Sequence, residues 1–139
     1  MTATTNPENN SADMYQQRLL RREQLAAELA PKSKMDYLVT LKSETDSSKT
    51  QIQLCYVPDK YVLNRISFEH YLSTLNQTNW QNLETLALEI LDDINNEVVP
   101  RWAQIVLNSA NDKSSNGHRV LVEDRQPNWE NVSLLRHLK

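Results

Sequence analysis

Four short segments of this chain have the residue pattern of β-strands. In three of them apolar and polar residues alternate, and the remaining one is an almost continuous apolar run. A short polar segment separates the first two and a turn-rich loop separates the last two, so each pair is predicted to form an antiparallel hairpin. The predicted strands are residues 35–42, 51–57, 103–107 and 119–123.

Between the two hairpins, apolar residues recur every three or four positions, which predicts two amphipathic helices. The first follows Ser67, whose hydroxyl can cap its amino terminus, and the second runs from about residue 80 to Pro100. Residues 11–31 are predicted to form a further helix, which the proline at its end stops, and residues 130–137 a short one.

The resulting order is a helix, then ββααββ, then a terminal helical piece. Two hairpins joined by a helical pair predict an α+β fold, in which a four-stranded antiparallel sheet carries two helices on one face. Residues 1–10 are polar and without periodicity, which predicts a disordered tail. We therefore expect this tail, an amino-terminal helix at residues 11–31 and a single domain at residues 35–139.

Composition narrows the possible chemistry. The 139 residues have a net charge of −3 and include one cysteine and one glycine. A single cysteine excludes a disulfide framework and a multi-thiolate metal site, and a single glycine excludes the loops that bind dinucleotides or phosphate. That cysteine, Cys55, lies in a predicted strand without a neighbouring base or cation, so it is interpreted as structural. Neither nucleic-acid binding nor a membrane span is expected, and without a secretion signal the predicted location is cytoplasmic.

Several segments resemble one enzyme family. The ββααββ order is that of the tunnelling fold, whose members bind purine- or pterin-like rings. Over roughly residues 50–125 the chain resembles the 7-cyano-7-deazaguanine reductases, the NADPH-dependent nitrile reductases of queuosine synthesis. The residues that carry this resemblance are Tyr56-Val57-Pro58-Asp59-Lys60, Ser67, Phe68, Tyr71, Leu72, Leu75, Asn76, Gln77, Thr78 and Pro100-Arg101-Trp102.

The positions that carry the family's chemistry differ in this chain. The family's signature has a glutamate and two lysines that face the anionic cofactor, and the corresponding residues here are Asn64, Ile66 and Glu69. An apolar side chain and a carboxylate in place of ammonium groups remove the attraction for NADPH. The nucleophilic thiolate and its assisting aspartate fall near Leu41 and Ser48, neither of which can perform the step. The resemblance therefore implies a related scaffold without this catalytic apparatus.

The same resemblance implies one candidate ligand site. In the tunnelling fold, a glutamate near the start of the second helix binds the N–H and amine donors of the ring. Aligned back from Pro100 this residue is Glu84, and aligned from Tyr71 the position falls near Asn82. A carboxylate suits two parallel hydrogen bonds from a guanidine-like edge, and the nearby Trp80 is a candidate to stack on the ring. The alternative is that Glu84 only stabilises the first turn of its helix and that Trp80 belongs to the core.

Two charged clusters have simpler interpretations. Arg18, Arg21 and Arg22 are diluted by acidic residues, which predicts a solvated helix face. Asp92 and Asp93 point in different directions on a helix, which predicts a solvated pair and not a paired-carboxylate site.

Two functions are compatible with these residues. The first is a non-catalytic tunnelling-fold protein without a cofactor, a binding or assembly module for a purine- or pterin-like ring. The alternative is the cofactor-side half of a split NADPH-dependent nitrile reductase, to which a homologous partner subunit supplies the nucleophile. A homo-oligomer is expected, because both edges of a four-stranded sheet have unpaired N–H and C=O groups and no proline interrupts the predicted strands.

Overall fold

Four strands form the main sheet of the computed structural model, which describes residues 7–45, 49–76, 80–110 and 117–138. All neighbours in the sheet are antiparallel, and the strand order is β2-β3-β5-β6. The strands are β2 (Val39–Glu44), β3 (Thr50–Val57), β5 (Trp102–Ala110) and β6 (Gly117–Arg125). The alternation of side chains predicted this sheet correctly, although its first strand begins four residues later than expected.

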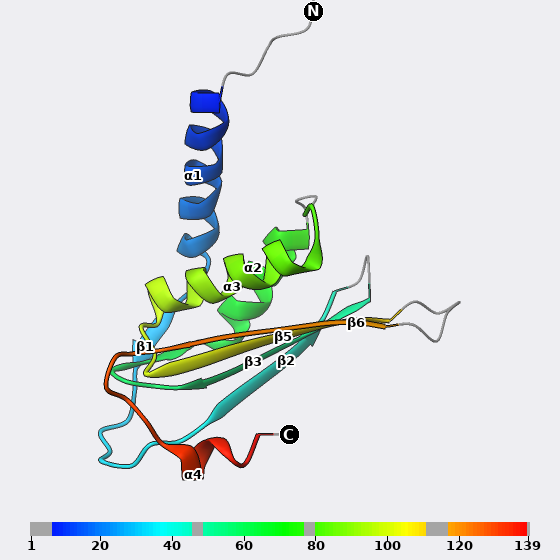
Figure 1. The fold of residues 1–139 in the computed structure, drawn as a ribbon. Helices are drawn as coiled ribbons and strands as arrows, with labels where there is room; N and C mark the ends of the chain where they lie inside the picture. Colours follow the sequence, from blue (N-terminus) through cyan, green and yellow to red (C-terminus); the bar gives the residue numbers. More distant parts are fainter. Residues whose placement is uncertain (1–6, 46–48, 77–79, 111–116, 139) are drawn as a thin grey trace, which may run out of the picture.

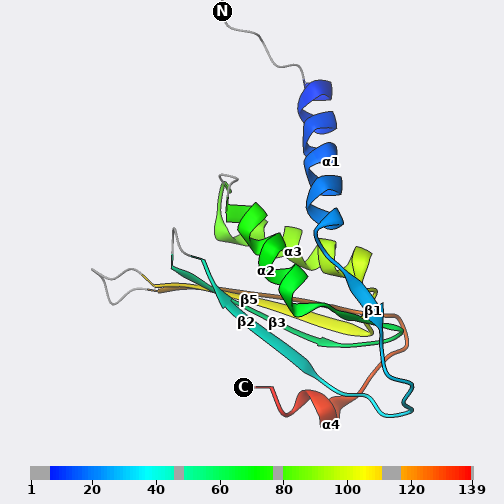
Figure 2. The same cartoon turned by 180° about the vertical axis from the view of Figure 1, so that it is seen from behind.

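Two helices cover one face of the sheet. Helices α2 (Arg65–Asn76) and α3 (Leu83–Glu97) lie side by side on it, whereas the short α4 (Val132–Leu135) lies against the opposite face (Figures 1 and 2). The predicted α+β class, with two helices on one face of a four-stranded antiparallel sheet, is confirmed.

The main core lies between the sheet and these two helices. Alternate residues of β3, namely Ile52, Leu54 and Tyr56, face the apolar stripe of α3 that contains Ile90 and Ile94. Each of these side chains is almost fully buried, and such burial stabilises the fold by about 1.5–3 kcal/mol per large apolar side chain. The fold is therefore held by one contiguous cluster on the helix-covered face.

The amino-terminal helix ends earlier than the sequence predicted. Helix α1 (Pro7–Glu23) stops before Gln24, and the chain then forms β1 (Ala27–Leu29), which pairs with β4 (Tyr61–Leu63) in a separate two-stranded sheet. Residues 24–31 were predicted as helix and this was wrong. The Ala26 N–H donates to Ser67 Oγ at 3.0 Å and its carbonyl accepts from Asn64 N–H at 2.8 Å, so tertiary pairing overrides the local helical preference.

Other boundaries also needed correction. Because α1 begins at Pro7, the predicted disordered tail of residues 1–10 overlaps a helix, and residues 1–6 lie outside the described part of the chain. Asn64, not Ser67, caps α2, since its side-chain oxygen accepts from the Ser67 N–H at 2.9 Å. Asn82 caps α3 in the same way, so that helix begins after Trp80.

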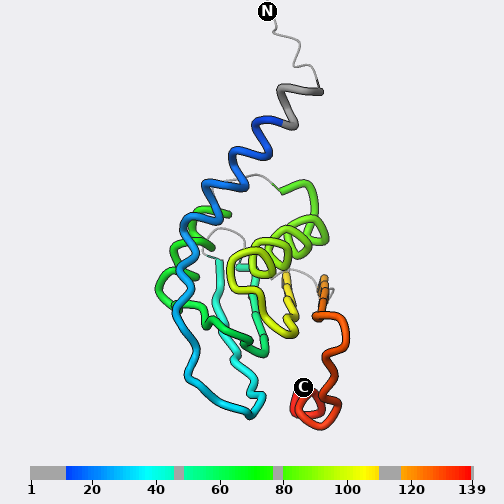
Figure 3. Tube along the Cα trace, turned by 90° about the vertical axis from the view of Figure 1, so that its left-hand side faces the viewer, coloured from blue at the N-terminus to red at the C-terminus, as the bar shows by residue number. Residues whose placement is uncertain are grey.

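The amino-terminal part of α1 projects away from the body of the molecule (Figure 3). Its carboxyl-terminal part contacts α2 and α3. Within the described residues, no helix is both long and apolar enough to cross a membrane.

Candidate functional site

Glu84, the candidate ring-binding carboxylate, lies on the surface at one edge of the sheet. It belongs to the first turn of α3, and its Oε1 atom is 3.1 Å from Nε2 of His118 on the edge strand β6. Both side chains are more than half exposed. The carboxylate is therefore accessible to a ligand, and its partner His118 lies on the edge strand β6.

The other two candidate residues have structural partners. The side-chain oxygen of Asn82 accepts from the N–H and the hydroxyl of Thr85, both at 2.7 Å, as an N-cap. The Trp80 indole N–H donates to the Leu75 carbonyl at 3.0 Å, and the Arg21 guanidinium lies 5.4 Å from the ring centroid. Trp80 thus contacts α1 while Glu84 contacts β6, so these side chains do not converge on one pocket.

The residues matched to the reductase signature are divided between core and surface. Phe68 and Tyr71 are buried, and their rings stack with centroids 6.2 Å apart. Ser67 links α2 to the segment before β1, as described above. Asn76 is exposed at the end of α2, and Gln77 and Thr78 lie outside the described residues.

The positions at which the chain departs from the signature differ in burial and in hydrogen bonding. Asn64 caps α2 and donates to Glu28 Oε1 at 2.8 Å, whereas Ile66 and Glu69 are exposed. Leu41, near the family's nucleophile position, packs against the main core. Cys55 is 1% exposed. Its Sγ atom lies 3.3 Å from Thr40 Oγ1 and 3.4 Å from Gln53 Nε2. Its interpretation as a structural cysteine agrees with this burial.

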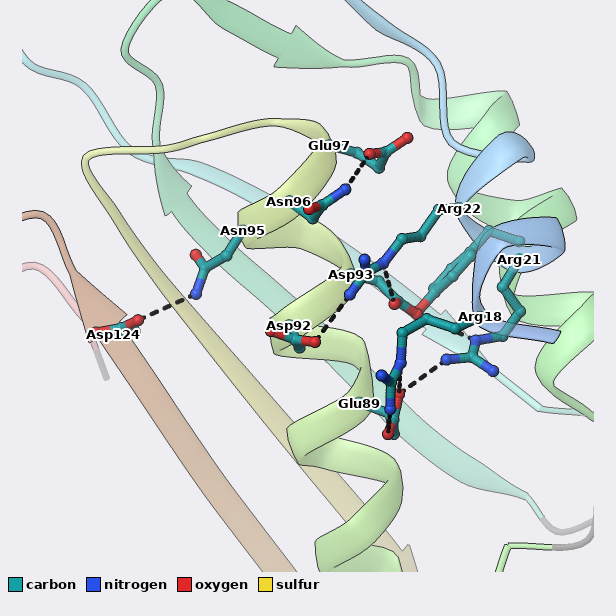
Figure 4. Close-up of polar contacts among 11 residues, drawn as sticks. Arg18, Arg21, Arg22, Glu89, Asp92, Asp93, Asn95, Asn96, Glu97 and Asp124 are labelled. Atoms are coloured by element: carbon teal, nitrogen blue, oxygen red, sulfur yellow. Dashed lines mark hydrogen bonds and ion pairs between the residues drawn. The ribbon is translucent and has the colours of Figure 1, made fainter. Parts of the chain in front are cut away.

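The most elaborate polar cluster joins α1 to α3 (Figure 4). Arg18 binds Glu89 with two nitrogens, at 2.7 and 3.3 Å, and Arg21 reaches the same carboxylate at 2.8 Å. Arg21 also donates to Asp93 at 3.1 Å. Arg22 donates to Asp93 at 2.9 Å and to Asp92 at 2.8 Å. We call these six residues the α1–α3 junction.

The junction overturns two predictions from the sequence. The Arg21 side chain is 7% exposed and that of Asp93 is fully buried, so neither belongs to a solvated face. Asp92 alone matches the prediction, with 63% of its side chain exposed. Three cations face three carboxylates, so the buried charges are balanced and the desolvation cost is offset by charge-assisted hydrogen bonds.

The junction extends into the core through Tyr71. Its hydroxyl donates to Asp93 Oδ2 at 2.5 Å. Burial raises the pKa of Tyr71 well above its ordinary value, and the adjacent Asp93 carboxylate raises it further. Burial of Glu89 by itself would raise its pKa, but the hydrogen bond and charge of Arg18, with the charges of Arg21 and Arg22, lower it. The lowered pKa favours the ionised form of Glu89, and the raised pKa of Tyr71 keeps its hydroxyl a neutral donor.

The face of the sheet opposite α2 and α3 is polar over much of its area. The strand register places Glu44, Gln51, Asn108 and Arg119 side by side in one row across the sheet. Two shallow hollows of about 480 and 450 Å³ lie on this face and share Gln53, Val106 and Asn108 in their lining. Around these shared residues the hollows are lined by Lys42, Ser43, Glu44, Gln51, Ile52, Gln104, Arg119, Leu121 and Leu138.

Comparison with solved structures gives distant matches. No protein-family model matches the chain, and no curated protein matches it. The solved structure of archaeosine synthase QueF-Like in the apo form is similar to it with 15% sequence identity and a TM-score of 0.41. That match covers 72% of this chain and 92% of the solved chain. So distant a similarity assigns no residue a role.

The described residues present accessible polar surfaces. No group of three or more His, Cys, Asp or Glu side chains that could hold a metal ion occurs among the residues that the structure places. Arg18 and Glu89, the ionised groups with shifted pKa values, pair with each other in the junction. The accessible polar groups include Glu84 beside β6 and the polar face of the sheet.

Proposed function

We propose that this chain is a non-catalytic tunnelling-fold subunit, related to the 7-cyano-7-deazaguanine reductases, which assembles edge to edge with further copies of itself. Its ligand is a purine- or pterin-like ring, held at the seam between two copies. No cofactor takes part in this function.

The exposed sheet edges are the observation that carries the proposal. Within the described residues, β2 and β6 each pair with only one other strand, so each has an outer row of backbone N–H and C=O groups to offer. Strand directions alternate across the sheet, and β6 of one copy beside β2 of the next continues that alternation. Copies can therefore join head to tail, each with its β6 antiparallel to β2 of the next copy.

Side-chain charge on the two edges supports the same pairing. Glu44 on β2 and Arg119 on β6 lie in the same row of the sheet. If the row continues from one copy into the next, Arg119 of one copy lies beside Glu44 of its neighbour. Opposite charges on adjacent strands contribute about 0.2–1 kcal/mol per pair, which is enough to favour one register over others.

Glu84 supports the ligand part of the proposal by its position. It stands beside β6, at the edge where the neighbouring copy would pair, and more than half of its side chain is exposed. A seam between copies supplies the enclosure that an isolated surface carboxylate lacks, and a carboxylate accepts the paired N–H donors of a guanidine-like ring edge.

The assembly is tested by light scattering coupled to size exclusion. We expect a mass above that of the 16.1 kDa chain. Arg119→Glu and Glu44→Arg should each weaken association, and the double variant should restore it because the charges are exchanged. A single 16.1 kDa species that persists on concentration would refute the assembly. Failure of the double variant to restore association would refute this pairing of edges.

The ligand is tested by isothermal titration with guanine, 7-deazaguanines and pterins. Glu84→Gln should abolish the heat of binding, whereas Glu69→Gln, an exposed glutamate on α2, should leave it unchanged. Equal heats for Glu84→Gln and the wild type would refute the assignment of this residue. Oxidation of NADPH in the presence of 7-cyano-7-deazaguanine would refute the non-catalytic function and favour the split-reductase alternative.

A further inference from the structure

The carboxyl-terminal segment, residues 126–138, crosses the face of the sheet that α2 and α3 leave uncovered (Figures 1 and 2). Its apolar side chains cover a second, smaller apolar cluster on the sheet, formed by Cys55, Val57 and Trp102. The covering residues, together with Leu38 from the segment before β2, are Trp129, Leu134, Leu135 and Leu138.

Polar anchors hold only the first half of this segment. The Gln126 side chain donates to Asp59 Oδ2 at 3.2 Å. Trp129 Nε1 and Asn131 Nδ2 both donate to Asp36 Oδ2, each at 3.2 Å. Beyond Asn131, the described side chains that contact the sheet are leucines. No side-chain hydrogen bond is described between this part of the segment and the sheet.

The second half of the segment has little local stability. Helix α4 is a single turn of four residues, and none of its side chains is fully buried. Isolated helical turns of this length are unstable, because the cost of nucleation is not recovered by hydrogen bonds. Segments with few buried contacts open at a lower free energy than the core. The end of the segment is therefore able to lift while the sheet and its main core stay folded.

Lifting this end changes the uncovered face of the sheet. In the closed arrangement, Cys55, Val57 and Trp102 are at most 3% exposed. Leu138 forms part of the wall of the hollow that also contains Gln53 and Gln104. Removal of that wall joins the polar hollow to an apolar floor and produces one larger amphipathic groove.

We propose that residues 126–138 are a lid, anchored at Asp36 and Asp59, whose second half, residues 132–138, opens to uncover a groove on the sheet. This device does not depend on the edge-to-edge assembly or on Glu84. The groove that it uncovers has amide side chains at one end and Val57 and Trp102 at the other.

The single cysteine of the chain reports the opening. Cys55 lies under the lid, and its thiolate attacks methyl methanethiosulfonate, releases methanesulfinate and becomes a mixed disulfide that mass spectrometry detects. In the wild type, labelling without denaturant should depend only weakly on added urea, because a local opening exposes little surface. Leu138→Ala and Leu135→Ala should each accelerate it by about tenfold.

A destabilised core variant separates lid opening from global unfolding. Ile90→Val lowers global stability on the other face of the sheet, and it should leave labelling without denaturant unchanged. Amide exchange gives a second measurement, since the N–H groups of Leu135, Arg136 and Leu138 are bonded only within the lid. These should exchange faster than those of β5 in every folded variant.

Two results would overturn the lid. One is labelling of Cys55 that follows global unfolding, with the full urea dependence of the unfolding transition and acceleration by Ile90→Val. The other is an unchanged labelling rate in both leucine variants while each remains folded by circular dichroism.

Discussion

Replacement of Asp93 by asparagine tests the central claim about the α1–α3 junction. The substitution keeps the size of the side chain and removes its charge. Asp93 is fully buried and accepts from Arg21, Arg22 and the Tyr71 hydroxyl. Loss of one partner of a buried ion pair costs about 3–5 kcal/mol, because the other charge is left without compensation. This is at the upper end of the range for single substitutions.

The other contacts of the junction place the expected cost near the lower end of that range. Arg21 keeps Glu89 and Arg22 keeps Asp92, so we expect Asp93→Asn to cost about 3 kcal/mol. With a urea m-value of about 1.5–2 kcal/mol/M for a domain of this size, the midpoint of unfolding falls by about 1.5–2 M.

The neighbouring Asp92 provides a matched control. Asp92→Asn removes the same charge from the same helix, but 63% of that side chain is exposed, so its ion pair contributes at most about 1 kcal/mol. Urea unfolding followed by tryptophan fluorescence and far-ultraviolet circular dichroism gives both midpoints. If the two variants shift the midpoint equally, the junction is not buried in solution and α1 is not held as described.

Three further predictions concern single side chains. Tyr71→Phe should cost about 1–3 kcal/mol in urea unfolding, because it leaves a buried Asp93 oxygen short of one donor. Glu89 has a pKa lowered from 4.5, so its stabilisation is complete above about pH 4.5 and is lost as the pH falls through the lower folded value. Glu89→Gln should therefore lower stability at pH 7 and flatten its decline in acid, and an unchanged decline would contradict this. Val99 follows the C-cap of α3 with a φ of 49°, where glycine is usual. Val99→Gly should raise the free energy of unfolding by about 0.5–1 kcal/mol, and therefore the melting temperature, whereas Val99→Ala should raise neither.

The sequence predicted those parts of the fold that have a local pattern. Alternation predicted β3 because its even-numbered residues face the main core and its odd-numbered residues face the opposite side of the sheet, and a spacing of three and four predicted α3. Strands β1 and β4 have three residues each, too few for a period to be recognised, and they exist because they pair with each other. A helical continuation through Ala26 was the better local choice, and only the tertiary contacts overrule it.

The α1–α3 junction was missed because its partners are about 70 residues apart in the chain. A signal for it was nevertheless present. Arg18, Arg21 and Arg22 have the same spacing as Glu89, Asp92 and Asp93, namely i, i+3 and i+4 on a helix. Two stripes of opposite charge and equal spacing predict helices that pack against each other. Each cluster was interpreted by itself, and each was therefore assigned to solvent.

Burial separates the residues that match the nitrile-reductase signature from those that depart from it. The matched residues Phe68 and Tyr71 are buried between α2 and the rest of the core, and Tyr71 also holds Asp93. The departures at Ile66 and Glu69 are exposed, and a side chain on the surface is exchanged at little cost to stability. The matched positions therefore bear on the packing of this fold, and the departures bear on its surface. Substitutions at the two kinds of position should therefore differ in effect, because Phe68 and Tyr71 act on stability through packing whereas Ile66 and Glu69 act only on the surface.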